Sequence, residues 1–494
     1  MNKTSIHSSP AQRLPEPHVA PLAQRRVLVV SDRLPIQLTC EVGEGWRADR
    51  AHGSLVAALN PVLRERRGVW IGWPGVAEEK APEPQVLAGA IQAGGSSMRP
   101  VSLSARDVQG AYDGFGGGII WPLFHEQPLE CRFDPAAWQA YRRVNRKFAR
   151  AAAKTLSRTS RESDLLWVHN HLLMNVAAEL RTLRVPCRTA FFLHLPFPAP
   201  DLFLKLPWRE RLLRGLLAYD QLGFQTPRDL QNFLDCANAL NVSQEIRANA
   251  FPIGVDFHSV AERAGSPEVV SAAARLREQH GGRSLILGID RLDRSKGISE
   301  KLEAFAELLA RRPELHDRVS LIQVVVPSRE DLPRHRELGC EIARQVGEIN
   351  GRFSRPGWIP VHFLQRTLTP DELLAHYRAA DVALITPLRE GMNLVAKEYC
   401  AARVDGQGTL VLSEFAGAAF QLSPGALLVN PHNATATART LHKALRMAEG
   451  ERGRRMRSLR EEVRRHDIFW RAESFLARAL DESPERALRL HQTL

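Results

Sequence analysis

Short apolar segments that favour β-strands recur along this chain, and each is followed by a stretch with helical periodicity. The strand candidates are residues 25–35, 165–171, 189–198 and 220–226 in the first half, and 283–297, 319–331, 360–366, 381–391, 408–414 and 426–430 in the second. This alternation predicts parallel strands joined by crossover helices. At 494 residues the chain is too long for one ordinary core, so we expect two α/β domains.

Near the middle of the chain, Pro252 and Gly254 interrupt the apolar pattern. We therefore predict an N-terminal domain over residues 25–252, a C-terminal domain over residues 253–469, and a final helix within residues 470–494 that packs back on the first domain. The first 24 residues are rich in Pro, Ser and His and lack the apolar core of a signal peptide. We interpret them as a flexible tail.

Several classes of protein are excluded by composition and motifs. No run of eighteen apolar residues occurs, so we expect no membrane span. The six cysteines lie far apart without a C-x-x-C pair, which favours free thiols in a reducing cytoplasm, and no His or Cys spacing suits a metal. The net charge of +12 is scattered, which indicates an Arg-rich surface and no nucleic-acid partner. Neither a P-loop nor a G-x-S-x-G motif is present.

Polar residues directly follow the predicted strands. In doubly wound sheets, ligands bind outside the carboxyl ends of the strands, so these positions are the candidates for a site. They are Asp32, Arg33, His169, Asn170, His194, Arg291, Lys296, Arg329, Arg389, Glu390 and Gly391. Because both halves of the chain present such residues, we predict a cleft between two Rossmann-like domains that holds a two-part substrate.

The turn "RLDRSKG" places Arg291 and Lys296 five residues apart. Together they could hold a phosphate-bearing ligand, one as a planar fork and the other as a point charge. The alternative is a surface ion pair with Asp290 or Asp293. The spacing alone leaves both interpretations open.

The stretch "TPLREGMNLVAKEY" (386–399) leads from a strand into a helix. The amides of residues 391–394 would suit a diphosphate, although Glu390 could instead simply cap the helix. Glu398 lies too far into the helix to cap it. It could accept hydrogen bonds from a pair of ligand hydroxyls, or it could pair with Lys397 or Arg403 at the surface.

Three aromatic side chains have two interpretations each. His194 lies in the apolar "FFLHLPFP" and could be either a core group or a site residue. Tyr112 and Trp121 flank three consecutive glycines in "AYDGFGGGIIW", which we interpret as a mobile loop leading into a strand. The two rings could cover a sugar or form a plain core pair.

These segments, in this order, resemble one known family. The matching stretches are "VVSDRLP", "GVWIGWPG", "FFLHLPFPAPDLF", "LGFQTPRDLQNFLDC", "PIGVD", "DRLDRSKGI", "INGRF", "TPLREGMNLVAKEY" and "LSEFAGAA". The chain is similar, over about residues 26–470, to the trehalose-6-phosphate synthase family (glycosyltransferase family 20). The resemblance implies a GT-B architecture, with two Rossmann-like domains facing a central cleft.

The resemblance also implies a reaction and roles for individual residues. The family moves glucose from UDP-glucose to glucose 6-phosphate with retained configuration and without a metal or other cofactor. The leaving phosphate takes the acceptor proton. The implied catalytic residues are His194, Arg291, Lys296 and Glu390. The implied donor-binding residues are Gly53, Arg291, Lys296, Gly391, Met392, Asn393, Leu394 and Glu398. The implied acceptor-binding residues are Arg33, Tyr112, Trp121, Asn170 and Arg329.

The chain departs from the family pattern at several of these positions. Asn170 and Glu390 stand where the family usually has Asp, His52 replaces the first glycine of a pair, and Arg294 replaces a Tyr. These departures leave the acceptor and the nucleotide base open. The alternatives are a sister synthase that uses glycerol 3-phosphate and a non-catalytic sugar-phosphate-binding paralogue. The expected partners are a nucleotide sugar and a sugar phosphate, in the cytoplasm, and a homo-oligomer is compatible with the sequence.

Overall fold

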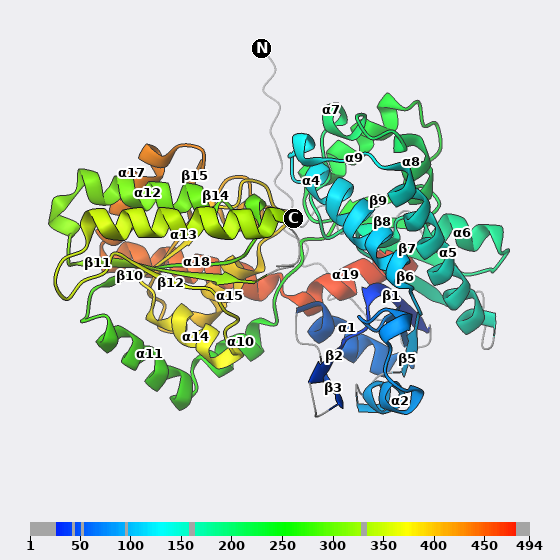
Figure 1. Cartoon of the computed structure of the whole chain (residues 1–494), viewed down its shortest axis with the longest axis horizontal. Helices are drawn as coiled ribbons and strands as arrows, with labels where there is room; N and C mark the ends of the chain where they lie inside the picture. The colour runs from blue at the N-terminus through cyan, green and yellow to red at the C-terminus, as the bar shows by residue number, and fades with distance from the viewer. Residues whose placement is uncertain are drawn as a thin grey trace, which may run out of the picture.

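The computed structural model describes residues 26–41, 45–50, 54–93, 97–157, 164–327 and 333–480. Two domains lie side by side, each built around a parallel sheet (Figure 1). The predicted N-terminal tail, Gly53 and Arg329 lie outside the described residues. Over the part of the chain that is described, no helix has the length and apolar character needed to cross a membrane.

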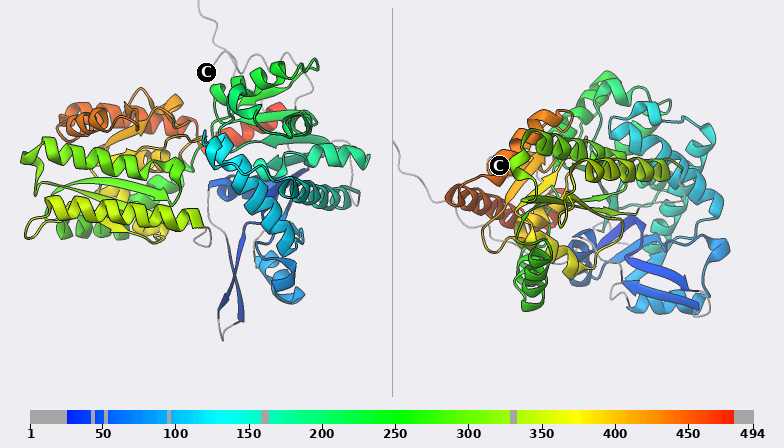
Figure 2. Two further views of the ribbon diagram at one scale, coloured as in Figure 1. Left: turned by 45° about the horizontal axis from the view of Figure 1, so that its top comes forward. Right: turned by 60° about the vertical axis from the view of Figure 1, so that its left-hand side comes forward.

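The first domain contains a seven-stranded sheet of order β5-β4-β1-β6-β7-β8-β9, in which every pairing is parallel. Its strands are β1 (Val27–Arg33), β4 (Val69–Trp73), β5 (Ser97–Pro100), β6 (Leu165–His169), β7 (Arg188–Phe192), β8 (Gln221–Phe224) and β9 (Ala248–Ala250). An antiparallel hairpin of β2 (Ile36–Glu41) and β3 (Gly45–Arg50) projects from this domain (Figure 2).

The second domain contains a six-stranded parallel sheet of order β12-β11-β10-β13-β14-β15. Its strands are β10 (Ser284–Arg291), β11 (Val319–Val326), β12 (Val361–Leu364), β13 (Val382–Ile385), β14 (Thr409–Ser413) and β15 (Leu427–Val429). In both sheets the strand order reverses direction beside the first strand. The reversal lies between β1 and β6 in one sheet and between β10 and β13 in the other, and crevices at such points bind ligands.

Helices cover both faces of each sheet (Figure 1). Those of the first domain are α1 (Ser54–Glu65), α2 (Pro84–Ala93), α3 (Ala105–Asp107), α4 (Trp121–Phe124), α5 (Pro135–Ser157), α6 (Val176–Thr182), α7 (Pro200–Phe203), α8 (Arg209–Leu216) and α9 (Pro227–Ala239). The later ones are α10 (Phe257–Ala264), α11 (Pro267–Gln279), α12 (Ile298–Arg311), α13 (Pro333–Phe353), α14 (Pro370–Ala379), α15 (Leu394–Ala402), α16 (Ala419–Leu422), α17 (Ala434–Leu445), α18 (Glu449–Arg465) and α19 (Ile468–Leu480).

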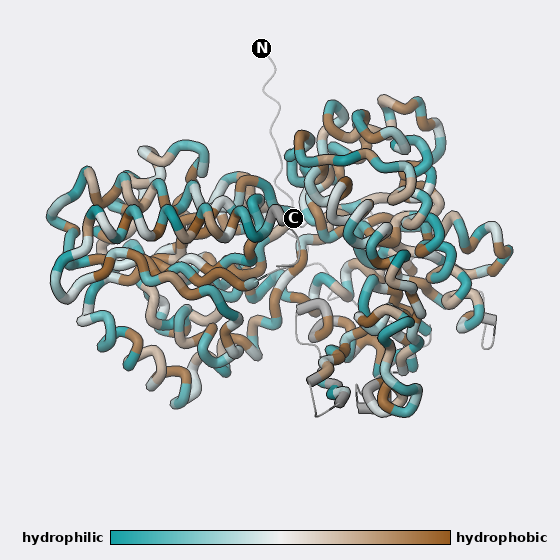
Figure 3. The backbone as a smooth tube through the Cα atoms, viewed as in Figure 1, coloured by the Kyte–Doolittle hydropathy of each residue, from teal (hydrophilic) through white to brown (hydrophobic). Residues whose placement is uncertain are grey.

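The continuous apolar runs in the sequence follow from this covering. In β1, residues 27–30 are fully buried on both faces, as are the interior residues of β10 and β11. A parallel sheet between two layers of helices offers no solvent face, so its strands are apolar throughout instead of alternating. Figure 3 shows the strands of the second sheet as a hydrophobic layer through the middle of that domain.

The chain crosses between the domains twice, and the two crossings touch. A Cβ on Gly254 would lie 2.4 Å from the main chain of Asp467, and Ile468 N donates to Val255 O. After the second crossing, α19 packs on the first sheet, where Phe475 stacks on Trp167 with ring centroids 4.6 Å apart. The last described helix therefore belongs to the core of the first domain (Figure 1).

The segment around Tyr112 differs from the expected loop and strand. Residues Val108–Ile120 form a π-helix, η3, that continues into α4. Its glycines allow close helix packing, because a Cβ on Gly110 would lie 2.4 Å from the Cβ of Ala140 in α5. In the glycine run itself, a Cβ on Gly116 would lie 2.5 Å from Leu172 Cδ2, so this part of the helix is also closely packed. The prediction of a loop leading into a strand was wrong. Strands β2 to β5 and β9 were also not anticipated.

Candidate active site

The loops that follow β10 and β13 bring Lys296 and Glu390 together. Lys296 lies in the short 3-10 helix η6 (Arg294–Lys296), and its Nζ forms an ion pair with Glu390 Oε1. Gly297 has a φ of 62°, and a Cβ there would lie 2.1 Å from Thr386 O. Only glycine permits this contact between the loops, so the close approach of the two loops positions the ion pair.

Glu390 does not cap the following helix. Its second oxygen, Oε2, accepts a hydrogen bond of 2.8 Å from Asn393 Nδ2. Asn393 is itself the N-cap of α15, with Oδ1 accepting from Ala396 N at 2.9 Å. Burial alone would raise the pKa of Glu390, but Lys296 and Asn393 together lower it. Glu390 is therefore a carboxylate held between two donors, and the capping interpretation was wrong.

The amides at the start of α15 remain available for an anion. Within the described residues, those of Gly391 to Leu394 donate to no carbonyl or side chain. Gly391 lies against the other domain, where a Cβ would be 2.6 Å from His194 O. This places the helix N-terminus, with its partial positive charge, directly at the domain boundary.

Glu398 lies one turn into α15 and is held by Tyr377. The Tyr377 hydroxyl donates to Glu398 Oε2 at 2.9 Å. Burial raises the pKa of Glu398, and the Tyr377 hydroxyl partly opposes that rise. Lys397 instead donates to Ile253 O, and Arg403 bonds elsewhere, so Glu398 makes neither of the surface pairs considered above.

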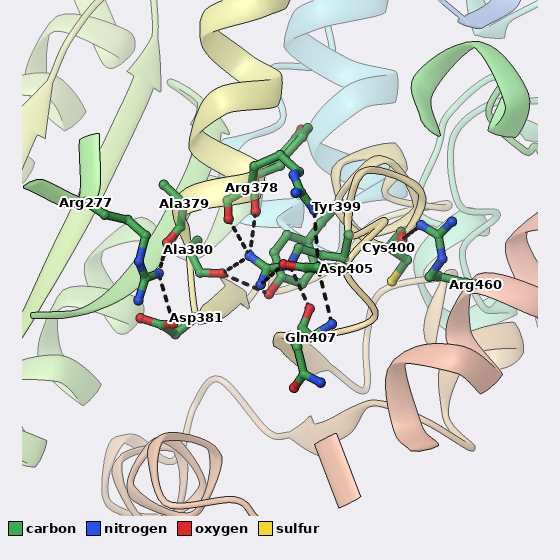
Figure 4. Close-up of polar contacts among 12 residues, drawn as sticks. Arg277, Arg378, Ala379, Ala380, Asp381, Tyr399, Cys400, Asp405, Gln407 and Arg460 are labelled. Atoms are coloured by element: carbon green, nitrogen blue, oxygen red, sulfur yellow. Dashed lines mark hydrogen bonds and ion pairs between the residues drawn. The ribbon is translucent and has the colours of Figure 1, made fainter. Parts of the chain in front are cut away.

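The helix ends behind Glu398 are fixed by arginines (Figure 4). Arg403 donates to the carbonyls of Tyr377, Arg378 and Ala380 at the end of α14. Arg460 donates to the last carbonyls of α15 at Cys400 and Ala401. These contacts satisfy the unpaired carbonyls at both helix ends and hold Tyr377 and Glu398 in register.

Arg291 reaches across the domain boundary. Its guanidinium carbon lies 5.3 Å from the centre of the Trp121 ring, which comes from the first domain. The neighbouring Asp290 is bonded instead to Lys301 and Gln323. The surface ion pair considered for Arg291 is therefore not formed with Asp290. Arg291 thus lies against the first domain, while the nearby Lys296 is held by Glu390.

His194 follows β7 and contacts a second imidazole. His194 Nε2 lies 3.3 Å from His169 Nδ1. Burial lowers the pKa of His194 to about 3 and that of His169 well below its usual value, and the nearby Arg471 adds to both effects. Both rings are therefore neutral at pH 7, and the contact fixes which His194 nitrogen faces His169.

The predicted acceptor residues gather at the end of β1. The Arg33 guanidinium carbon lies 5.0 Å from the centre of the Trp73 ring, and that ring meets Tyr112 edge-on at 5.0 Å. The Tyr112 hydroxyl donates to Asp32 O at 2.7 Å. Asn170 directly follows the neighbouring β6. Trp121 lies beside this group, with its ring centre 6.2 Å from that of His171.

The domains are also joined by a buried ion pair that the sequence did not reveal. Arg389, beside Glu390, lies 3.4 Å from Asp229 of α9 and 3.2 Å from Glu126. A cavity of about 500 Å³ opens between the domains beside Trp121 and Asp293. Asp32, His169 and Arg389 were candidates because they stand at strand ends, but the sequence assigned them no role. Trp73 and Tyr377 were not among the candidates.

Comparisons with known proteins agree with this geometry. The model of glycosyltransferase family 20 matches residues 25–480. The chain is 41% identical over 471 residues to the trehalose-6-phosphate synthase of Mycobacterium bovis, covering 91% of this chain and 93% of that protein. It is also 41% identical over 488 residues to the trehalose-6-phosphate synthase of Mycolicibacterium gilvum, covering 94% and 95%.

Solved structures give the same result. A trehalose-6-phosphate enzyme of E. coli bound with UDP-2-fluoro glucose superposes with a TM-score of 0.82 at 33% identity, covering 93% of this chain and 100% of that one. An α,α-trehalose-phosphate synthase from Burkholderia xenovorans, in complex with glucose-6-phosphate, gives 0.81 at 32% identity, covering 92% and 100%. The predicted GT-B fold and the resemblance are confirmed, and the chain belongs to glycosyltransferase family 20.

Proposed function

We propose that this protein transfers glucose from UDP-glucose to glucose 6-phosphate and gives trehalose 6-phosphate with retained configuration. The observation that carries the proposal is the pair of strand-order reversals facing one cleft. One presents Arg291, Lys296, Glu390 and the amides of α15, and the other presents Arg33, Tyr112 and Asn170. The relatives named as trehalose-6-phosphate synthases and the two liganded neighbours support the same reaction.

The donor half of the cleft suits a leaving diphosphate. Breaking the bond between the anomeric carbon and the diphosphate oxygen leaves negative charge on that oxygen. Arg291, Lys296 and the unbonded amides of residues 391–394 are positive groups already held in place, so they stabilise that charge without reorganisation. We assign the ribose hydroxyls to Glu398, whose carboxylate lies one turn further on and accepts a hydrogen bond from Tyr377.

Glucose is transferred on the face from which the diphosphate leaves. The acceptor hydroxyl oxygen bonds to the anomeric carbon, and its proton passes to the departing diphosphate oxygen. No protein nucleophile is needed, and His194, neutral at pH 7, serves to orient the donor sugar. The Arg389–Asp229 pair favours a closed cleft that keeps water from the reactive sugar.

In other enzymes a metal ion neutralises the charge of a bound diphosphate, and here positive groups of the protein can do so. Two cationic side chains and a helix N-terminus neutralise the diphosphate, so we propose that turnover needs no metal or other cofactor. The six free thiols suit a reducing compartment, and we propose a cytoplasmic location. Turnover in the presence of EDTA tests the first point, and fractionation of the cells tests the second.

The reaction is tested by incubating the full chain with UDP-glucose and either glucose 6-phosphate or glycerol 3-phosphate. We expect UDP release and a non-reducing phosphorylated disaccharide only with glucose 6-phosphate, and proton NMR should show two α-configured anomeric centres. UDP release only with glycerol 3-phosphate would overturn the proposal in favour of the sister synthase. No release with either acceptor would favour the non-catalytic paralogue.

A further inference from the structure

Asp32 and Asn170 lie side by side where the strand order of the first sheet reverses. Strands β1 and β6 pair in parallel with Val30 opposite Val168, so Asp32, the second-to-last residue of β1, and Asn170, which directly follows β6, lie at the same end of the sheet. The Asn170 side chain lowers the pKa of the Asp32 carboxylate, as a donor group beside it would. A carboxylate and an amide therefore share the point at which a doubly wound sheet binds its ligand.

The Asn170 side chain has no acceptor left for a ligand. Its Oδ1 accepts from His171 N at 2.9 Å and lies 2.7 Å from His171 Nδ1. A backbone amide can only donate, so this contact fixes the oxygen of Asn170 toward His171 and the NH₂ group toward Asp32. An amide oxygen has two lone pairs, and both are used here. The Asp32 carboxylate is thus the acceptor that this pair can offer.

The surroundings of Asp32 place it within the acceptor half of the cleft. Its own carbonyl accepts from the Tyr112 hydroxyl at 2.7 Å, and Arg33 follows it in the chain and lies over Trp73. Burial raises the pKa of Asp32, while Arg33 and Asn170 oppose that rise. A carboxylate in this position gains from further hydroxyl donors, whereas the phosphate of a ligand would be attracted to Arg33.

We propose that Asp32 is a specificity-determining residue that accepts hydrogen bonds from the hydroxyls of the acceptor sugar. Asn170 has no carboxylate, and Asp32 supplies one from the neighbouring strand β1. The inference rests on the proposed function, because it assigns a role in binding the same acceptor. It also explains how a chain with Asn at position 170 retains a carboxylate for a polyhydroxylated sugar phosphate.

The test exchanges the two side chains. Steady-state constants for both substrates are measured for the wild type, Asp32→Asn, Asn170→Asp and the double variant Asp32→Asn/Asn170→Asp. All the substitutions are nearly isosteric. We expect Asp32→Asn to raise the KM for glucose 6-phosphate about 10- to 100-fold, the loss of one or two charge-assisted hydrogen bonds, with the KM for UDP-glucose unchanged. We expect the double variant to recover most of that loss.

Two further readouts separate a binding role from a structural one. The rise in melting temperature on adding UDP should be the same in all four proteins, because the donor half is untouched. An unchanged acceptor KM in Asp32→Asn would overturn the inference, as would a double variant no better than Asp32→Asn. Either result leaves the proposed function standing, provided that the wild type uses glucose 6-phosphate. A wild type without that activity would overturn the proposed function first.

Discussion

Lys296 and Glu390 form an ion pair across 94 residues of sequence, between the loops that end β10 and β13. The pair lies at the strand-order reversal of the second sheet, where the donor diphosphate is proposed to bind. Because Glu390 also accepts from Asn393, its carboxylate links the cationic loop to the N-terminus of α15. The first two predictions below concern Lys296 and Glu390.

Replacing Lys296 by Ala should abolish most of the turnover while the protein stays folded. A preorganised cation at a leaving group contributes about 10²- to 10³-fold to kcat, so we expect a loss of at least that size. The loss is measured by UDP release at saturating substrates, with circular dichroism as the control for folding. Turnover within about tenfold of the wild type would contradict the role given to Lys296.

Shortening Glu390 to Asp tests the departure from the family pattern. The shorter side chain cannot reach both Lys296 and Asn393 as Glu390 does. We expect a rise in the KM for UDP-glucose of about 3- to 10-fold, the loss of about one hydrogen bond, with little change in the KM for the acceptor. A lower donor KM in Glu390→Asp would instead mean that the longer side chain obstructs the donor.

Removing the Tyr377 hydroxyl should weaken donor binding in a pH-dependent way. Burial raises the pKa of Glu398, and the hydroxyl of Tyr377 lowers it in part. In Tyr377→Phe the pKa of Glu398 rises further, so Glu398 ionises only at higher pH. We expect the acidic limb of the pH profile of kcat/KM for UDP-glucose to shift to higher pH. An identical profile in both proteins would show that Glu398 does not bind the donor as a carboxylate.

Breaking the Arg389–Asp229 pair should open the cleft. Arg389 joins the second domain to Asp229 and Glu126 of the first. In Arg389→Met we expect a larger radius of gyration by small-angle X-ray scattering without ligand, together with a lower kcat, because closure is less favourable. Arg366→Met is a matched control, since Arg366 pairs with Glu372 within one domain and at the surface. Equal radii of gyration in Arg389→Met and the wild type would argue against this pair as a clasp.

Arg471 is a buried cation whose replacement should stabilise the protein. No nitrogen of its guanidinium has a hydrogen-bond partner among the described residues, and the centre of the Phe192 ring lies 3.8 Å from the guanidinium carbon. A cation–π contact gives about 2 kcal/mol, whereas burying an unpaired charge costs several. We therefore expect Arg471→Met to gain about 1–4 kcal/mol at pH 7.

The stability gained in Arg471→Met should depend on pH. Burial lowers the pKa of Arg471 to about 9, below its unfolded value, so the cost of burying the charge is present below pH 9 and falls as the pH rises above it. The advantage of Arg471→Met should therefore shrink between pH 7 and pH 10 in denaturant melts. A variant less stable than the wild type at pH 7 would show that the cation–π contacts outweigh desolvation.

Most strands could be predicted from the sequence because a strand buried on both faces is apolar at every position, and such a run is visible locally. Ten of the thirteen strands in the two parallel sheets correspond to predicted segments, for instance β10 within residues 283–297 and β13 within residues 381–391. Two of the three that were not predicted, β5 and β9, are edge strands that are largely exposed or half-buried and so carry no apolar run. The third, β4, is buried throughout like the predicted strands, so its apolar run was a signal that was missed.

The sequence by itself determined which residues stand at the carboxyl ends of the strands, and so the outline of the cleft. Only the tertiary structure decided their partners: Glu390 with Lys296 and Asn393, Glu398 with Tyr377, and Asp32 with Asn170. Whether a segment forms a strand depends on residues a few positions away, so the local pattern of apolar residues indicates it. A hydrogen bond or ion pair depends on which strands lie side by side and how far each side chain reaches, and residues distant in the sequence decide that.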